Sequence, residues 1–474
     1  MEVLQRTANR GSVSTGYDID NSLKLEADNS ESLTRSAQDG GDRKKVTISF
    51  WTKRTELTGS YEMLIMAGVN GNKYSSLGFQ TTNTLDFHYY NSGSYPYQLT
   101  TNRVFRDASA WYHIVIAVDT TQGTAANRLK MYINGVQETS FAYETYPDQN
   151  IDTPFNNDSA TYPIEIGNDS VFDIGGIAYS GYIAEFNLID GSQLAPTEFG
   201  EFDDDSGIWI PKAYTGSYGD NGFYLDFADS GDLGDDESGN GNDFTEVNIA
   251  AADQATDTPT NNFCTFNPLM TQNNPPTISE GAMKSTGGGG TWNNTWGNMG
   301  VKNGKWYYEM KATNTSYTGY FGASTAPAEG SNTTGASISY NTSFFVGEAN
   351  SIDYYYWQNG SLTANESTGW GGFSNNDVLA LALDLDSSTK KFYLYKNGSL
   401  LNSGGTNLPT NMQDEFVFPL YIQYENRQDE LNFGGYTISS ISSAASDANG
   451  YGTFEYAPPT GYYALCTKNL AEFG

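Results

Sequence analysis

The sequence is poor in basic residues. It contains 24 lysines and arginines against 56 aspartates and glutamates, which gives a formal net charge of −32. A protein that binds a nucleic-acid backbone needs clustered lysine and arginine, so this balance argues strongly against that class of function. The charge instead predicts an acidic, solvated surface that self-repulsion keeps soluble, including in salty or calcium-containing water.

Histidine and cysteine are scarce as well, with two of each in 474 residues. His113 lies in an apolar segment, where a structural imidazole is expected, and His88 is expected on the face of a strand. This pattern gives no basis for a Ser-His-Asp site. Cys264 and Cys466 make neither a disulfide framework nor a metal site. We expect free thiols whose flanking segments pair as neighbouring strands.

Long apolar runs are missing too. No stretch of 18 apolar residues predicts a transmembrane helix, and residues 1–10 lack the apolar core of a signal peptide. Long helical patterns are also absent, whereas 51 glycines and 34 tyrosines accompany abundant Asn, Ser and Thr. This composition is typical of a turn-rich all-β protein, and the length predicts about two to three domains.

One hairpin pattern occurs twice. An apolar segment at 111–119 is followed by a polar gap, an aromatic-aliphatic segment and Asn134-Gly135, and the same order returns from 377 to Asn397-Gly398. Asn-Gly between alternating strands predicts a tight turn, because both residues tolerate a positive φ. The two copies predict two domains built on a common plan.

Short alternating segments separated by turn signals surround both copies and predict antiparallel β-sandwiches. We therefore expect an all-β protein with two such sandwiches in tandem. The expected boundaries are residues 1–35 for an N-terminal segment with a docking arm and first strands, 36–210 for the first sandwich, 211–285 for an irregular connector with short strands and an acidic turn, and 286–474 for the second sandwich.

Several ordered motifs carry a resemblance to known families. The strand ending near Trp51, the segment Trp111-Tyr-His-Ile-Val and residues 181–190 together resemble laminin-G-like, concanavalin A-like lectin/glucanase domains over about residues 20–210. The order of motifs over about residues 285–465 resembles a SPRY domain, itself a concanavalin A-like sandwich or jelly roll. These resemblances imply the fold, but the fold hosts lectins, glycosidases and spacers.

The tandem order also resembles structural proteins of marine tailed phages. The segments that carry this resemblance are residues 19–23, 105–115, 213–219 and 261–268. It implies a virion protein that is made in the host cytoplasm and released by lysis. Its expected partners are other virion proteins, copies of itself, and a host-cell surface glycan or protein, without membrane insertion.

Glycan binding needs aromatic rings that stack on sugars and polar groups that bond their hydroxyls. Three clusters fit this requirement, and the SPRY resemblance directs attention to loops at one end of the sandwich. They are Trp292 with Trp296; Tyr354, Tyr355, Tyr356 and Trp357 with Asn359; and Trp370. The alternative is that these side chains cap the sandwich or pack in an oligomer interface.

A calcium site is conceivable in the acidic loop. Asp236, Ser238, Asn240 and Asn242 offer oxygen ligands at alternating positions, as in the first half of an EF-hand loop. However, Val247 occupies the twelfth position, where the EF-hand loop has glutamate, and helical flanks are missing. A plain turn is the alternative.

Glycoside hydrolysis is the enzymatic alternative, and its retaining form needs two carboxyls about 5 Å apart. Asp384 and Asp386 have a suitable spacing but end an apolar strand, where aspartate usually starts a turn, and Glu185 stands alone. We therefore predict a non-enzymatic virion protein, of tail-fibre or surface type, that binds host-cell glycans or surface proteins through sandwich-end loops. The alternatives are a capsid-decoration or tail scaffold protein without ligand, and a glycan depolymerase.

Overall fold

The computed structural model describes most of the chain. The described residues are 16–36, 41–57, 59–155, 163–169, 174–175, 177–271, 275–288, 290, 292–325, 343–347, 350–358, 361–441 and 443–474. They form almost entirely antiparallel β-structure in two compact units, 14–260 and 261–474. Each unit is a pair of large sheets, which confirms the expected all-β class.

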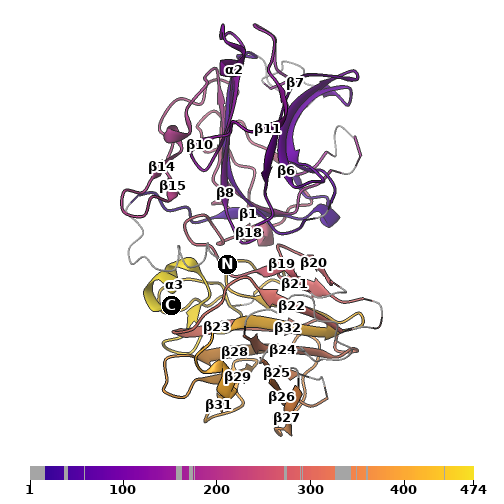
Figure 1. Cartoon of the computed structure of the whole chain (residues 1–474), viewed down its shortest axis with the longest axis vertical. Helices are drawn as coiled ribbons and strands as arrows, with labels where there is room; N and C mark the ends of the chain where they lie inside the picture. Colours follow the sequence, from indigo (N-terminus) through magenta and orange to yellow (C-terminus); the bar gives the residue numbers. More distant parts are fainter. Residues whose placement is uncertain are drawn as a thin grey trace. The chain divides into compact units, whose positions relative to one another are not determined.

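The described strands of the first unit form two eight-stranded sheets and a separate hairpin (Figure 1). The first sheet has the order β10-β9-β8-β3-β13-β1-β18, with β16 on β13, and the second has the order β11-β7-β6-β5-β4-β12-β2-β17. The first sheet contains β1 (Ser22–Leu25), β3 (Lys45–Arg54), β8 (Tyr112–Asp119), β9 (Leu129–Ile133), β10 (Val136–Gln137), β13 (Gly181–Asp190), β16 (Phe223–Leu225) and β18 (Gln254–Ala255). The second contains β2 (Ser32–Arg35), β4 (Glu62–Asn70), β5 (Lys73–Phe79), β6 (Thr84–Asn91), β7 (Ser94–Val104), β11 (Phe141–Thr145), β12 (Ile164–Ile166) and β17 (Thr245–Val247). The hairpin is β14 (Gly200–Phe202) with β15 (Trp209–Pro211), and the short helices are η1 (Ala27–Asn29), α2 (Ala125–Arg128), η2 (Pro196–Glu198) and η3 (Ala251–Asp253).

One hydrophobic core lies between the two sheets of the first unit. Ile48 and Phe50 reach it from the first sheet, and Leu77 and Phe87 reach it from the second. The alternation of apolar and polar residues along these strands sends every second side chain into this core. A smaller apolar cluster that includes Val115 and Ile189 lies apart from this core.

Both predicted Asn-Gly hairpins are present. Asn134 and Gly135 have φ values of 48° and 77°, and Asn397 and Gly398 have 47° and 75°. In each copy the apolar strand pairs with the strand before the turn. β8 pairs with β9, and β28 (Val378–Asp384) pairs with β29 (Lys391–Lys396). The repeated pattern is therefore a core ladder of each sandwich.

The first turn also supports a packed tryptophan. A Cβ atom added at Gly135 would lie 2.2 Å from Cε3 of Trp209. The Trp209 ring stacks on His113 and its Nε1 donates to Nδ1 of His113 at 3.0 Å. His113 is buried, which lowers its pKa to about 3, and its Nε2 lies 2.9 Å from Oγ of Ser49. This histidine is structural, as the sequence predicted.

Gly135→Ala should lower the unfolding free energy of the first unit by about 2–4 kcal/mol, because the new methyl group overlaps Trp209 and the backbone has a positive φ. Gly239→Ala is the matched control, since Gly239 has a φ of 84° but open space around the added Cβ. Thermal unfolding should show a clearly smaller loss for the control. Equal losses in the two variants would contradict a packing role for Trp209.

The segment predicted as a connector, residues 211–285, is divided between the two units. β16 pairs with β13, β17 with β2 and β18 with β1, so the part up to Thr260 completes the first sandwich. The remainder supplies the first strands of the second sandwich. Strands of two or three residues carry too little alternation to be found from sequence.

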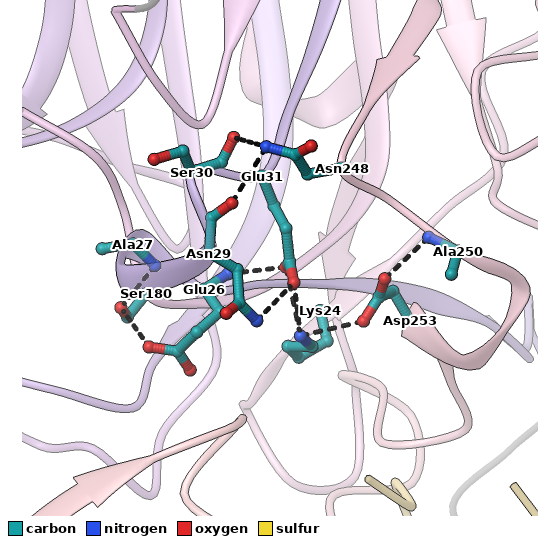
Figure 2. Close-up of polar contacts among 10 residues, drawn as sticks. All are labelled: Lys24, Glu26, Ala27, Asn29, Ser30, Glu31, Ser180, Asn248, Ala250 and Asp253. Carbon is teal, nitrogen blue, oxygen red and sulfur yellow. Dashed lines mark hydrogen bonds and ion pairs between the residues drawn. The ribbon is translucent and has the colours of Figure 1, made fainter. Parts of the chain in front are cut away.

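A buried ionic network ties the end of the first unit to its beginning (Figure 2). Nζ of Lys24, whose side chain is 1% exposed, lies 3.0 Å from Oε1 of Glu31 and 2.8 Å from Oδ1 of Asp253. The backbone N–H of Glu26 donates to Glu31 and that of Ala250 donates to Asp253. The network therefore fixes the turn around η3 against the first strand.

The described strands of the second unit form a seven-stranded and a nine-stranded sheet. Their orders are β19-β22-β32-β24-β25-β26-β27 and β20-β21-β33-β23-β28-β29-β30, with β31 on β29 and β34 on β23. The first contains β19 (Phe266–Thr271), β22 (Trp292–Gly297), β24 (Gly319–Ser324), β25 (Ser343–Gly347), β26 (Asp353–Gln358), β27 (Ser361–Ser367) and β32 (Phe418–Tyr424). The second contains β20 (Thr277–Ser279), β21 (Lys284–Thr286), β23 (Lys305–Ala312), β28 (Val378–Asp384), β29 (Lys391–Lys396), β30 (Ser399–Leu400), β31 (Thr406–Asn407), β33 (Gln428–Asn432) and β34 (Tyr463–Ala464), and the helices are η4 (Thr410–Met412) and α3 (Thr467–Phe473).

The two cysteines of this unit lie on paired segments. Phe263 forms an antiparallel bridge with Cys466, and the N–H of Cys264 donates to the carbonyl of Leu465 at 2.9 Å. Both cysteines are buried, and neither forms a disulfide. The expected pairing of their flanking segments is confirmed.

Within the described residues, no helix is both long and apolar enough to span a bilayer.

Candidate functional site

The predicted aromatic residues of the second unit lie mainly on strands, not in loops. Trp292 and Trp296 belong to β22, and residues 354–357 belong to β26. Strand alternation divides the second group. Tyr354 faces the core between the sheets, where its ring lies 5.6 Å from that of Phe392, and Tyr356 has the same parity. Tyr355 and Trp357 face outward.

The outer face of the seven-stranded sheet carries a continuous row of rings, here called the aromatic row. Tyr424, Trp292, Tyr320 and Tyr355 follow one another with centroid separations of 5.0, 5.7 and 5.2 Å. Trp357 packs on the same apolar floor. From Trp292 through Tyr320 to Tyr355, the ring centroids span at most about 11 Å. The row therefore offers a short, continuous aromatic surface.

Polar groups on this face are buried without partners. Among the described residues, neither Oδ1 nor Nδ2 of Asn294 is hydrogen-bonded, and the same holds for Oγ of Ser343 and Nε1 of Trp357. Asn294 lies between the two tryptophans of β22, and Ser343 lies opposite Trp357 in the sheet register. A buried, unpaired polar group costs about 1–3 kcal/mol, so groups of this kind call for a partner. A ligand rich in hydroxyl groups would supply such partners if the rings that cover these atoms moved aside.

Other predicted residues have different roles. Trp296 is only 1% exposed and donates from Nε1 to Oγ of Ser324 at 2.8 Å, so the expectation that it is an exposed ring is wrong. Apolar neighbours from β32 and β24 bury it. Trp370 is partly exposed in a loop whose Gly371 carbonyl accepts a bond from Ile352. Asn359 lies outside the described residues.

Sequence reasoning missed Tyr320, Tyr424, Asn294 and Ser343. Asn294 was visible as the middle member of an alternating Trp-Asn-Trp pattern at positions 292, 294 and 296. The other three lie on β24, β32 and β25, and only the pairing of distant strands brings them to this face. No local sequence pattern predicts that strand pairing.

The loop proposed for calcium is closed by its own hydrogen bonds. Oδ1 of Asp236 accepts from the N–H groups of Tyr224 and Ser238, and Oδ2 accepts from the N–H of Asn242 and the hydroxyl of Ser238. The side-chain amides of Asn240 and Asn242 donate to the carbonyl of Gly222. These hydrogen bonds are typical of a closed turn.

A fixed positive charge lies near this loop. Burial lowers the pKa of Arg35 to about 10, and the carboxylates of Asp236 and Asp243 oppose that shift. Among the described residues, no group of three or more His, Cys, Asp and Glu side chains could hold a metal. Calcium binding at the loop stays a prediction.

The buried carboxyl groups of Glu185 and Glu309 hold neighbouring segments in place through hydrogen bonds. Burial raises the pKa of Glu185 to about 7, and its carboxylate accepts from the hydroxyls of Tyr17 and Tyr224 at 3.0 and 2.7 Å. Burial also raises the pKa of Glu309 to about 7, while the N–H groups of residues 455 and 456 donate to its carboxylate. Asp384 accepts from the N–H and hydroxyl of Ser387, as expected for an aspartate that starts a turn.

Comparison with known proteins supports the first sandwich directly. Residues 26–197 match the family Laminin_G_3, described as the concanavalin A-like lectin/glucanases superfamily. The first unit has a concanavalin A-like fold. A search of curated proteins found no match.

Solved structures with similar folds include three of different origin. The SPRY domain of human HERC1 is 15% identical, covers 37% of this chain and 99% of its own, and has a TM-score of 0.27. Domains LG4-5 of the mouse laminin alpha1 chain are 10% identical to this chain, with a TM-score of 0.29. The match covers 95% of this chain and 97% of the laminin chain. A protein from Bacteroides ovatus, described as carbohydrate-binding, is 11% identical to this chain, with a TM-score of 0.30. The match covers 49% of this chain and 59% of the Bacteroides chain.

Proposed function

We propose that this chain is a non-enzymatic virion protein of a tailed phage, of tail-fibre or surface type, that binds host-cell glycans through the aromatic row. The observation that carries the binding role is the row of outward rings beside the unpaired polar groups of Asn294, Ser343 and Trp357. The concanavalin A-like fold of the first unit supports a recognition role. The tandem order of two sandwiches supports the virion assignment, with synthesis in the host cytoplasm and release by lysis.

The row suits carbohydrate for two physical reasons. Flat aromatic rings pack against the C–H faces of sugar rings, and amide, hydroxyl and indole groups bond the hydroxyls at their edges. The net charge of −32 repels anionic chains, so neutral glycans are the favoured class. The proposed site is a sheet face and not the sandwich-end loops that the SPRY resemblance suggested.

Trp292→Ala should weaken glycan or host-cell binding by about 10- to 100-fold, because it removes the ring that joins Tyr424 to Tyr320. A printed array of neutral and acidic glycans, followed by titration with the best binder, measures the effect. Leu400→Ala is the control, since Leu400 is a large apolar side chain, 42% exposed, on the nine-stranded sheet. It should bind like the parent.

Two other outcomes have defined meanings. Unchanged binding by Trp292→Ala would remove the row as the glycan site. If native mass spectrometry shows an oligomer that Trp292→Ala dissociates, and no glycan binds the parent, the row is an assembly interface. The chain would then be a capsid-decoration or tail scaffold protein.

A further inference from the structure

The first sandwich carries a separate polar and aromatic cluster on the outer face of its second sheet. Along β6, Leu85, Phe87 and Tyr89 enter the core, so Asp86, His88 and Tyr90 face outward. The register places Ser76 of β5 and Gln98 of β7 on either side of His88. The cluster is centred on one of the only two histidines in the chain.

Hydrogen bonds fix the tautomer of this histidine. Nδ1 of His88 lies 2.6 Å from Oδ2 of Asp86, while Gln98 and Thr100 donate to Oδ1 of the same carboxylate. Burial opposes ionisation of Asp86, but these bonds hold its pKa below the usual value. An ionised Asp86 requires the proton of neutral His88 on Nδ1. Nε2 is then a lone-pair acceptor, and no described residue bonds it.

Tyrosine rings surround the imidazole. Tyr95, Tyr74 and Tyr61 meet it edge-on at centroid distances of 5.3, 5.8 and 6.3 Å, and Tyr90 lies 5.5 Å from Tyr95. The Tyr95 side chain is 48% exposed, although His88 is only 8% exposed. Burial raises the pKa of Tyr74 to about 12, so this phenol stays neutral. The cluster combines one oriented hydrogen-bond acceptor, Nε2 of His88, with an accessible aromatic wall formed by Tyr95.

A covalent catalytic role for the Asp86–His88 pair would need a nucleophile next to the ring. Ser76, directly opposite in the register, is buried, and its Oγ lies 3.1 Å from the hydroxyl of Tyr61. A buried, bonded hydroxyl is poorly placed to attack a substrate. A single histidine also makes a weak metal site, because stable sites use three or four protein ligands. Ligand binding is the remaining use of the oriented acceptor.

We propose that the Asp86–His88 pair and the tyrosines around it bind a neutral saccharide, with one sugar hydroxyl donating to Nε2 of His88 and a sugar face packing on Tyr95. Charge selects the occupant, because the Asp86 carboxylate and the acidic protein disfavour uronate and sulfate groups. A lone-pair acceptor selects a hydroxyl donor. This site belongs to the first unit and does not depend on the aromatic row.

The two histidines make a direct spectroscopic test possible. In protein labelled with ¹⁵N in its imidazoles, a neutral oligosaccharide selected from a glycan array should shift the Nε2 signal of His88. His113 is an internal reference, because both of its nitrogens already have protein partners. Oligogalacturonate should shift neither signal. If the neutral sugar also leaves the His88 signal unmoved, the proposal is overturned.

Tyr95→Ala should weaken binding of the same sugar at this site by about tenfold, without a change in thermal midpoint, since the ring is half exposed. Phe202→Ala is the matched control, because Phe202 is 50% exposed on the separate β14–β15 hairpin. The measurements are made in the Trp292→Ala background, so that failure of the aromatic row and failure of this site give different results. Parent-like affinity of the Tyr95→Ala protein would refute the proposed wall.

Discussion

Replacing Asp257 with alanine should lower the unfolding free energy of the first sandwich by about 3–5 kcal/mol. Oδ2 of Asp257 lies 2.7 Å from Nζ of Lys53, and both side chains are 0% exposed. Oδ1 also accepts a bond from Nε1 of Trp111. Truncation removes one partner of a fully buried ion pair together with the acceptor of the Trp111 indole N–H, and breaking a buried pair from one side is strongly destabilising.

The measurement is calorimetric unfolding of the whole chain, in which the transition of the first unit should move and that of the second should not. Glu237→Ala is the control, because Glu237 is an exposed acid in the same segment, 211–260. It should change stability by less than about 0.5 kcal/mol. An unchanged transition in Asp257→Ala would mean that the end of this segment unfolds independently of the sandwich.

This prediction depends on a feature that the sequence did not reveal. The segment 211–260 is rich in Asp, Gly and Asn, so its composition indicated a connector. In the structure, three short strand pairings hold it to the sandwich, together with long-range side-chain contacts. These contacts include Lys53 with Asp257 and the Arg35 guanidinium donating to the carbonyl of Asn221. Contacts between residues far apart in sequence leave no local pattern.

The core ladders, in contrast, could be predicted. Residues 114–118 and 378–383 are apolar throughout, and the Asn-Gly pairs at 134–135 and 397–398 have only one common structural use. Composition, strand pattern and turn chemistry all agreed there. Where local signals agree, the fold follows from them.

The candidate site was found only in part. Aromatic residues marked Trp292, Tyr355 and Trp357, but the sequence could not decide which rings face outward, since both faces of β22 and β26 carry large or polar side chains. Trp296 is buried on a strand that pairs with β32, and Tyr354 is buried against Phe392 of β29 in the other sheet. The location of the site therefore depended on sheet pairing.

Arg427→Met should destabilise the second sandwich by about 3–5 kcal/mol and also weaken the aromatic row. The Arg427 guanidinium is fully buried, bonds Asp429 at 2.7 Å, and donates from Nη1 to the carbonyls of Asn314 and Tyr317. These bonds hold the loop that leads into β24, the strand that carries Tyr320. Loss of the guanidinium frees this loop and leaves the Asp429 carboxylate buried.

The destabilisation caused by Arg427→Met should grow with pH. Burial already raises the pKa of Asp429 to about 6, and Arg427 opposes that shift, so removing Arg427 raises the pKa further. A carboxyl whose folded pKa lies above its unfolded value favours folding when protonated, and this contribution is lost as the pH rises through the folded pKa. Urea unfolding at pH 5 and pH 8 should therefore give the larger difference from the parent at pH 8. The double variant Arg427→Met with Asp429→Asn should recover part of the stability and remove the added pH dependence, whereas an equal loss at both pH values would mean that Asp429 does not carry the uncompensated charge.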